Sequence, residues 1–166
     1  MIRFVLIGVL MTVCCMSETW GQQDSLTIEE KIMQEYQKRI RKSHINGFYI
    51  PVDLDDALRM LDEIVDEQGK RKFMSQEEDY AVSNVFFSFG RWINVNWGIE
   101  GGSRLTVALN KLGLDHPDDM VYFLMHSFYR HLKNQDLESE DLIRKIVEKR
   151  REREKAGRNK EIDKPR

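Results

Sequence analysis

The run Gly101-Gly102-Ser103-Arg104 combines the residue types that bind anions at the start of a helix. Two glycines let a backbone approach a ligand closely, and the free N–H groups of a helix N-terminus attract negative charge. Arg104, one residue past the expected cap Ser103, offers a guanidinium that can hold a phosphate or carboxylate through two hydrogen bonds. The structural alternative is a tight turn in which Ser103 caps the helix and Arg104 pairs with nearby acids. The run does not match the phosphate-binding loop, which requires Gly-x-x-x-x-Gly-Lys-Ser/Thr.

A second group of residues could form a surface for a partner. Exposed tryptophans beside amides can stack on and hydrogen-bond a sugar or a protein, and Trp97 directly follows Asn96. The interpretation that we favour instead places Trp92 in the core and Trp97 against the turn at Gly98, because large aromatic side chains are mostly buried. If the protein acts by binding, we expect its interaction surface to contain Trp97, Tyr122 and His116.

The histidines and acids lack the spacing of a metal or catalytic site. His126 and His131 are five positions apart, which is about 140° around a helix, whereas a two-histidine zinc helix uses positions i and i+4. Asp118 and Asp119 are expected in the first turn of a helix, where the helix dipole stabilises negative charge. No serine stands in a nucleophile elbow. The sequence therefore predicts no metal, no cofactor and no catalytic residue, and an enzyme is the least favoured class of function.

Residues 1–21 have the pattern of a secretory signal peptide. Arg3 precedes an apolar run of 13 residues, and Thr19 and Gly21 are small residues suited to a cut before Gln22. The apolar run is too short for an ordinary membrane-spanning helix of ~20 residues. We therefore expect an exported protein, periplasmic or secreted, with no stable membrane insertion after cleavage.

Both cysteines, Cys14 and Cys15, lie within this leader. The exported chain would then contain no thiol, which excludes disulfides, a cysteine nucleophile and a cysteine-based zinc site. Lipoprotein anchoring is disfavoured as well, because Val13 rather than a small residue precedes Cys14.

The charges divide the chain into an acidic core and a basic tail. Residues 48–133 contain 9 Lys and Arg against 14 Asp and Glu, whereas residues 143–166 contain 11 against 5. Glutamates are interleaved with the basic residues of the tail and can pair with them at helical spacing. We expect a solvated tail and no nucleic-acid binding, with a dynamic contact to an acidic partner as the alternative.

Caps and apolar spacing predict an all-α fold, a small compact bundle of four to five helices. Asp53, Ser103 and His116 (or its neighbour Asp115) are expected to cap helices, and Gly113 with Leu114 suggests a Schellman ending. Ranges in which we expect helices are 27–43, 54–68, 75–97, 104–112, 117–133 and a tail from 139. The second of these helices is expected to end at Gly69, and the third to open with a capping box formed by Ser75 and Glu78.

The aromatic run at 84–97 is also rich in strand-forming residues, but its length and its opening signal favour a helix. The expected organisation is a leader at 1–21, an N-terminal helix and linker at 22–47, a helical core domain at 48–134 and a charged tail at 135–166. Beyond Glu148 the tail is almost entirely polar and charged, so we expect it to fray or to be disordered.

Several motifs in a fixed order resemble a known family. They read YIPVDLDDALRMLDEI, FGRWINVNWGIEGGSRLTVALNKLGLDHPDDM and HSFYRHL. Together they resemble a bacterial domain of unknown function, the one numbered 6794, over about half of the chain from Tyr49 to Lys133. The resemblance implies a compact, mostly helical domain with no assigned activity. It carries over no catalytic residues.

The sequence thus favours an exported helical domain that acts as a protein-interaction module, with another envelope protein as the expected partner. The alternative is a small-ligand or anion-binding domain that uses the helix start at Ser103 and Arg104. The oligomeric state does not follow from the sequence.

Overall fold

The computed structural model describes residues 27–162, and the side chains of residues 27–158. The expected leader, its cut before Gln22 and both cysteines therefore lie outside the described residues. The chain divides into two units, Met1–Ile32 and Met33–Arg166. Of the first unit only the short stretch 27–32 is described, and it begins the first helix.

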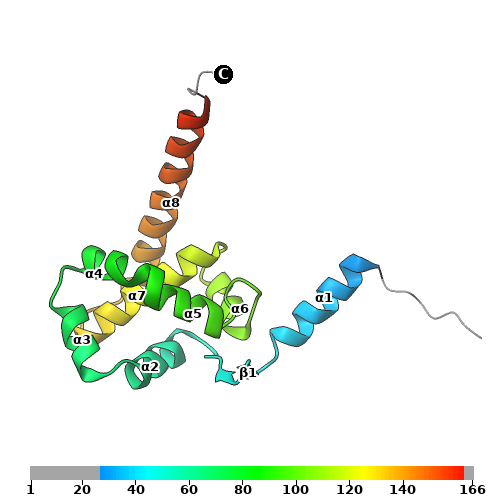
Figure 1. Cartoon of the computed structure of the whole chain (residues 1–166), viewed down its shortest axis with the longest axis horizontal. Coiled ribbons are helices and arrows are strands. Elements are labelled where there is room, and N and C mark those ends of the chain that lie inside the picture. The colour runs from blue at the N-terminus through cyan, green and yellow to red at the C-terminus, as the bar shows by residue number, and fades with distance from the viewer. Residues whose placement is uncertain (1–26, 163–166) are drawn as a thin grey trace, which may run out of the picture. The chain divides into compact units, whose positions relative to one another are not determined.

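The described chain is mostly helical, which confirms the helical fold class. It differs from the expected bundle of four to five helices in having one short hairpin and more, shorter helices among the described residues. Helix α7 is the central element: ten of its sixteen residues are buried, and it packs against α2, α4 and α8 (Figure 1). The elements are α1 (Ile28–Arg39), β1 (His44–Ile45), β2 (Phe48–Tyr49), α2 (Leu54–Ile64), α3 (Glu67–Met74), α4 (Glu78–Val85), the π-helix η1 (Phe86–Gly90), α5 (Arg91–Asn96), α6 (Arg104–Lys111), α7 (Pro117–Leu132) and α8 (Ser139–Ile162).

Local side-chain caps begin most of the helices where the sequence predicts them. The Asp53 carboxylate accepts a hydrogen bond from the first turn of α2, Ser103 caps α6, and the His116 ring accepts from the first turn of α7. At the end of α6, Gly113 has a φ of +95° and the Leu114 N–H donates back into the helix, which confirms the Schellman ending. Cap chemistry acts over three or four residues, so a sequence can show it directly.

Two helix boundaries were predicted wrongly. Ser75 does not open α4, because its hydroxyl donates to the Lys72 carbonyl at 2.8 Å and Glu77 is the cap instead. Gly69 does not end α2, which ends at Ile64. Asp66 then caps a separate helix, α3, and accepts from the Gly69 N–H at 2.7 Å.

The single helix expected over 75–97 is three segments. The π-helix η1 separates α4 from α5 and closes at Gly90. A Cβ atom on Gly90 would lie 3.0 Å from the Val121 side chain and 3.1 Å from the Met125 sulfur, so glycine permits η1 to approach α7 closely. Because a π-helix has a wider turn than an α-helix, η1 also changes the direction of the phenylalanines that it carries.

The β1–β2 hairpin lies in a segment that was expected to be a linker. Its turn residues Asn46 and Gly47 have φ angles of +50° and +84°, which suit a two-residue hairpin turn. The hairpin buries Ile45, and it is followed by the fully buried Ile50. These two side chains attach the segment to the core.

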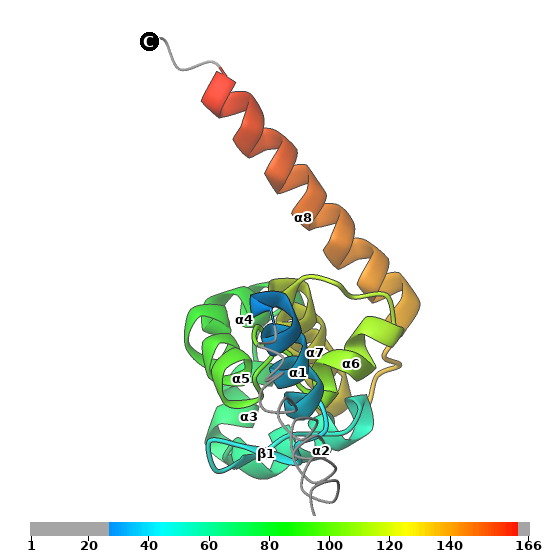
Figure 2. The same ribbon diagram turned by 90° about the vertical axis from the view of Figure 1, so that its right-hand side faces the viewer.

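Helix α8 extends to Ile162, beyond the point at which fraying was expected. Leu142 and Ile146 are buried against the core, whereas the described side chains after Arg150 are exposed, and the helix leads away from the body of the molecule (Figure 2). Among the described residues, no helix has the length and hydropathy needed to cross a membrane.

Candidate functional site

The side chains of Ser103 and Arg104 are committed to the fold. Ser103 is fully buried and shares a capping box with Thr106. The Arg104 Nε donates to the Ile50 carbonyl at 2.7 Å, a second guanidinium nitrogen reaches the same oxygen, and the guanidinium lies 4.8 Å from the centre of the Tyr49 ring. Arg104 thus holds the segment after the hairpin.

The glycines of the same run lie under the C-terminal half of α1. Gly102 has a φ of +78°, and a Cβ atom there would lie 2.5 Å from the Tyr36 ring. At Gly101, a Cβ atom would lie 2.7 Å from the guanidinium of Arg39. The two glycines permit the side chains of Tyr36 and Arg39 to approach the backbone closely. This favours the structural interpretation of the run over anion binding.

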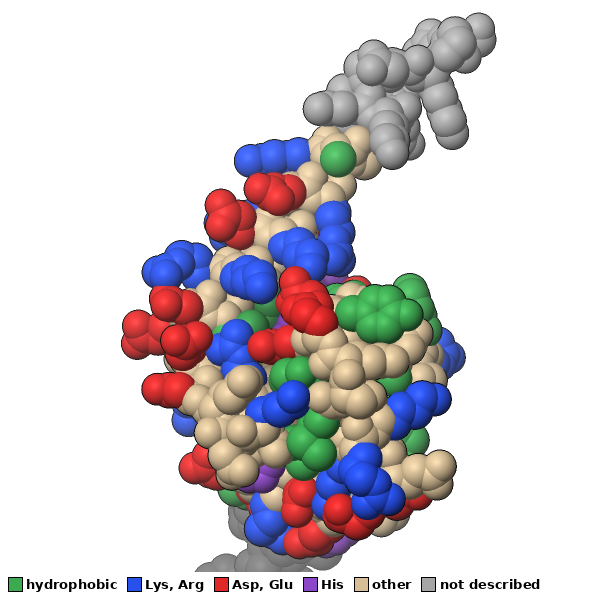
Figure 3. Space-filling view, turned by 90° about the vertical axis from the view of Figure 1, so that its left-hand side faces the viewer, with side chains coloured by type: hydrophobic (Ala, Val, Ile, Leu, Met, Phe, Trp, Pro, Cys, Tyr) green, Lys and Arg blue, Asp and Glu red, His purple; other side chains and the backbone are tan. Residues whose placement is uncertain are grey.

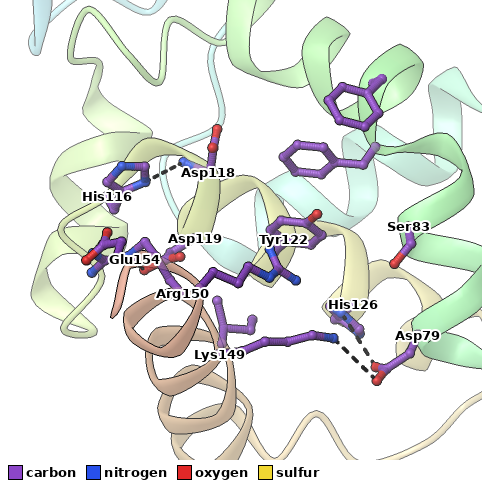
Figure 4. A pocket seen from close by; sticks show the side chains of 14 residues that line it. Asp79, Ser83, His116, Asp118, Asp119, Tyr122, His126, Lys149, Arg150 and Glu154 are labelled. Carbon is purple, nitrogen blue, oxygen red and sulfur yellow. Dashed lines mark hydrogen bonds and ion pairs between the residues drawn. The ribbon is translucent and has the colours of Figure 1, made fainter. Parts of the chain in front are cut away.

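The structure separates the three residues that the sequence places on an interaction surface. Trp97 is 1% exposed and packs edge-to-face against Trp92 at 6.1 Å, as the favoured buried interpretation predicts. Its place on the expected interaction surface is therefore corrected: this side chain belongs to the core. Tyr122 and His116 do come together. Both line a cavity of about 370 Å³ formed by α4, η1, α7 and α8 (Figure 4).

One side of this cavity is aromatic, and we call Phe86, Phe87 and Tyr122 the aromatic wall. The Phe86 and Tyr122 rings are stacked with centroids 4.0 Å apart and planes 11° apart. Phe87 meets the Phe86 ring edge-on at 5.6 Å and is 87% exposed to solvent. The aromatic wall therefore consists of the stacked rings of Phe86 and Tyr122 and of the solvent-exposed ring of Phe87.

The opposite side of the cavity is formed by α8 and carries basic side chains. Lys145, Lys149 and Arg153, here called the basic ridge, are spaced four residues apart and so follow one row along the helix surface. Of the three, Lys149 and Arg153 line the cavity. Both lysines approach the Asp79 carboxylate, at 3.5 and 3.8 Å. The Arg153 guanidinium lies 5.9 Å from the centre of the Tyr122 ring, and no carboxylate among the described side chains pairs with it. Figure 3 shows basic side chains along α8 above hydrophobic ones on the body of the molecule.

Arg150 also lines the cavity, but its charge is already matched. Its guanidinium contacts Asp119 at 2.7 Å, Glu154 at 2.9 Å and Asp115 at 3.4 Å. The hydrogen bonds that Arg150 donates, first to Asp119 and then to Glu154, raise the pKa of Arg150 above its usual value. Because the Asp119 side chain is only 3% exposed, this ion pair clamps α8 to the start of α7.

A histidine and two acids meet at the inner end of the cavity. His126 Nδ1 lies 2.7 Å from Glu78, which also accepts from Arg130 at 3.0 Å, and His126 Nε2 lies 4.0 Å from Asp79 (Figure 4). Burial lowers the pKa of His126, although Glu78 opposes the shift. Ser83 lines the same cavity, yet no hydrogen bond joins it to His126 within residues 27–158. The described groups thus do not assemble a serine–histidine pair.

No group of three or more His, Cys, Asp or Glu side chains that could hold a metal ion is found in the described part of the chain. His116 and Asp118 contact each other through a hydrogen bond that the Asp118 N–H donates to the His116 ring at 3.3 Å. That contact is a helix cap.

The residues that sequence reasoning missed are Phe87 and the basic ridge. Two signals were present. Phe87 falls outside the inner stripe of its helix, and Lys145, Lys149 and Arg153 recur at intervals of four. That these residues face each other depends on the π-helix and on the docking of α8, which are not local properties of the sequence.

Fold and cavity together define a small helical domain with an aromatic-walled cavity beside a basic helix. The chain belongs to the family described as Domain of unknown function (DUF6794), whose model matches residues 50–132. This confirms the resemblance seen in the sequence. No curated protein and no solved structure matches the chain. The family region includes the aromatic wall but ends before α8, which supplies the basic ridge.

Proposed function

We propose that this protein is an exported, non-enzymatic interaction module that binds a partner protein of the envelope through the aromatic wall. The observation that carries the proposal is the position of Phe87, a large apolar side chain left 87% exposed at the edge of a cavity of about 370 Å³. Burying such a side chain is worth roughly 1.5–3 kcal/mol. An apolar group from a partner would supply that burial.

The local geometry supports this role. Aromatic residues are enriched in the buried centres of protein interfaces, and a few such side chains carry most of the binding energy. A π-helix is rare and is often found at functional sites. Here η1 directs Phe86 onto Tyr122 and leaves Phe87 in solvent. The wall is thus arranged before any partner arrives, so binding loses little free energy in ordering it.

Export is part of the proposal and rests on the leader pattern at residues 1–21. An envelope partner follows from that location. The alternative function, an anion site at Ser103 and Arg104, has less support, because the Ile50 carbonyl and the Tyr49 ring already occupy the Arg104 guanidinium.

The proposal is tested by capture of a partner from a solubilised envelope extract, using residues 22–166 as bait. Phe87→Ser is compared with Tyr80→Ser, a matched control, because Tyr80 is an aromatic on α4 that is 61% exposed and does not line the cavity. We expect a protein that is retained by the wild type and by Tyr80→Ser but lost with Phe87→Ser. Equal retention by all three forms would refute a role for the aromatic wall.

A further inference from the structure

The aromatic wall lines one side of the cavity from η1 and α7, and Lys149 and Arg153 of the basic ridge line it from α8. Lys145, which contacts Asp79, continues the ridge beyond the lining. We infer that the partner is bound through an extended acidic segment in which carboxylate side chains alternate with aromatic ones. This inference rests on the proposed function and adds the chemistry of the partner to it. The carboxylates would contact the basic ridge, and an aromatic side chain would lie against Phe87.

The charges on this side of α8 favour an acidic partner. The ridge holds three cations, Lys145, Lys149 and Arg153, and within the described side chains Asp79 is the carboxylate that pairs with it. Both lysine contacts are long for ion pairs, and Arg153 has the Tyr122 ring beside it rather than an acid. Two positive charges therefore remain unmatched along the ridge.

The remaining acids of the cavity lie toward the start of α7. Asp119 is held by Arg150, as are Glu154 on α8 itself and the neighbouring Asp115, which does not line the cavity. Asp118 lines the cavity and has no ion pair among the described side chains. The charges of the three acids that contact Arg150 are thus partly compensated. The acidic segment that we infer would follow the other side of the cavity, between the ridge and η1.

The dimensions suit an extended chain. Eight residues separate Lys145 from Arg153, so the ridge is about 12 Å long at 1.5 Å per residue. That length corresponds to about four residues of extended chain at 3.3 Å each. Because side chains of an extended chain alternate between two sides, acids at positions i and i+2 would face the ridge while position i+1 faces the aromatic wall.

A single-stranded nucleic acid also combines negative charge with flat rings. The cavity suits a nucleic acid less well, because every nucleotide carries a phosphate. Some of these phosphates would contact the basic ridge, but others would be repelled by Asp79 and by the exposed carboxylate of Asp118. A peptide can place its carboxylates on one side only. We therefore assign the ridge to an acidic peptide segment, and nucleic acid is an outcome of the test.

The test is titration of residues 22–166 with acetyl-Glu-Phe-Glu-Phe-amide, followed by NMR chemical shifts of the backbone amides. Acetyl-Lys-Phe-Lys-Phe-amide, acetyl-Glu-Ala-Glu-Ala-amide and oligothymidylate are the comparison ligands. We expect the acidic aromatic peptide to bind most tightly and to shift residues of η1 and α8. Raising the NaCl concentration from about 0.05 M to about 0.5 M should weaken its binding, because salt screens exposed charges.

Charge reversal locates the contact. Arg153→Glu should weaken binding of the acidic aromatic peptide about tenfold, a change of about 1.4 kcal/mol. Arg151→Glu is the matched control, because Arg151 is an exposed arginine of the same helix that does not line this cavity. Circular dichroism of both variants checks that they remain folded.

The outcomes separate this inference from the proposed function. Equal affinity for the acidic and basic aromatic peptides, or an Arg153→Glu protein that binds as the wild type does, overturns the acidic segment but leaves the aromatic wall in place. Absence of binding at about 1 mM peptide, the weak end of specific binding, also overturns it. Tighter binding of oligothymidylate reassigns the ridge to nucleic acid. The proposed function itself fails only if Phe87→Ser still captures the partner.

Discussion

Gly102 and Gly113 adopt similar left-handed backbone conformations in different surroundings. Their φ angles are +78° and +95°, but a Cβ atom on Gly102 would lie 2.5 Å from the Tyr36 ring, whereas nothing lies within 4 Å of one on Gly113. Replacing glycine by alanine at a left-handed position costs about 1 kcal/mol. We expect Gly113→Ala to lower the free energy of unfolding by about that amount, and Gly102→Ala to lower it by more. Urea denaturation measures both.

Tyr36 provides the control for the glycine pair. In a Tyr36→Ala background the contact is gone, so the cost of Gly102→Ala should fall to that of Gly113→Ala. Equal costs for the two substitutions in the wild-type background would show that the Tyr36 ring moves aside freely. In that case the turn at Gly101 and Gly102 would not be tightly covered by α1.

His126 makes the stability depend on pH. Its pKa in the folded protein is lowered from 6.5, first by burial, with Glu78 and Asp79 opposing and Lys145 reinforcing the shift. The unfolded chain therefore takes up the proton more readily than the folded one. The contribution of His126 to the free energy of unfolding is fully present above about pH 6.5. It is lost as the pH falls from there toward the lowered pKa of His126 in the folded protein.

The measurement is the free energy of unfolding of wild type and His126→Gln between about pH 7.5 and about pH 5, a range that spans the usual histidine pKa. The wild type should lose more stability than the variant as the pH falls. His131→Gln is the control, because His131 is exposed on the same helix, and its pH profile should follow that of the wild type. A His126→Gln profile parallel to the wild type would contradict the assignment.

The boundaries that were predicted correctly depend on local chemistry. A side chain such as Ser103 caps the helix that begins at the next residue, so residue type and spacing reveal it. Ser75 shows the limit of this reasoning. Its sequence pattern is that of a cap, but α4 is capped by Glu77, two residues later, whose side chain accepts a hydrogen bond from the Tyr80 N–H. The hairpin signal, Asn46 followed by Gly47, was present in the sequence and was not used.

The elements that were not predictable depend on contacts distant in sequence. The π-helix ends at Gly90, where α7 comes within 3.0 Å of the position that a Cβ atom would occupy. The cavity depends in turn on η1, α7 and the docking of α8. Of the expected interaction residues, Tyr122 and His116 line this cavity while Trp97 is buried. The sequence could indicate such residue types but not which of them face one another.

The Arg150 clamp predicts how α8 responds to a single substitution. Asp119 is almost fully buried, and Arg150 contacts it at 2.7 Å. Removing one partner of a buried pair leaves an uncompensated charge and costs about 3–5 kcal/mol. Arg150 itself is partly exposed, so solvent reduces the cost. We expect Arg150→Met to lose about 2 kcal/mol of stability and the amide protons of α8 beyond that residue to exchange faster.

Arg151→Met is the matched control for the clamp, because no ion pair of Arg151 is found among the described side chains and its side chain is exposed. Its stability and hydrogen exchange should stay close to those of the wild type. Similar behaviour of the two variants would mean that the other contacts of α8, chiefly the burial of Leu142 and Ile146, are enough to fix it on the core.

At the scale of the whole molecule, the stable unit should be larger than both the family region and the expected core domain. The family model matches residues 50–132, and the sequence suggested a core at 48–134. The buried core, however, also includes Ile45 from the hairpin and Leu142 and Ile146 from α8. These side chains connect the segments on either side of the family region to its interior.

Three fragments test this prediction: 33–158, 48–158 and 33–134. Burial of one large aliphatic side chain contributes roughly 1.5–3 kcal/mol, so 33–134, which loses Leu142 and Ile146, should be less stable than 33–158 by about 3–6 kcal/mol. Loss of Ile45 should make 48–158 less stable by about half as much. Since a small domain has only about 5–15 kcal/mol in total, 33–134 should lose a large share of its stability and unfold at a lower urea concentration than 33–158. Equal urea midpoints for 33–134 and 33–158 would instead show that α8 is an appendage, and that its basic ridge stands beside a core that folds without it.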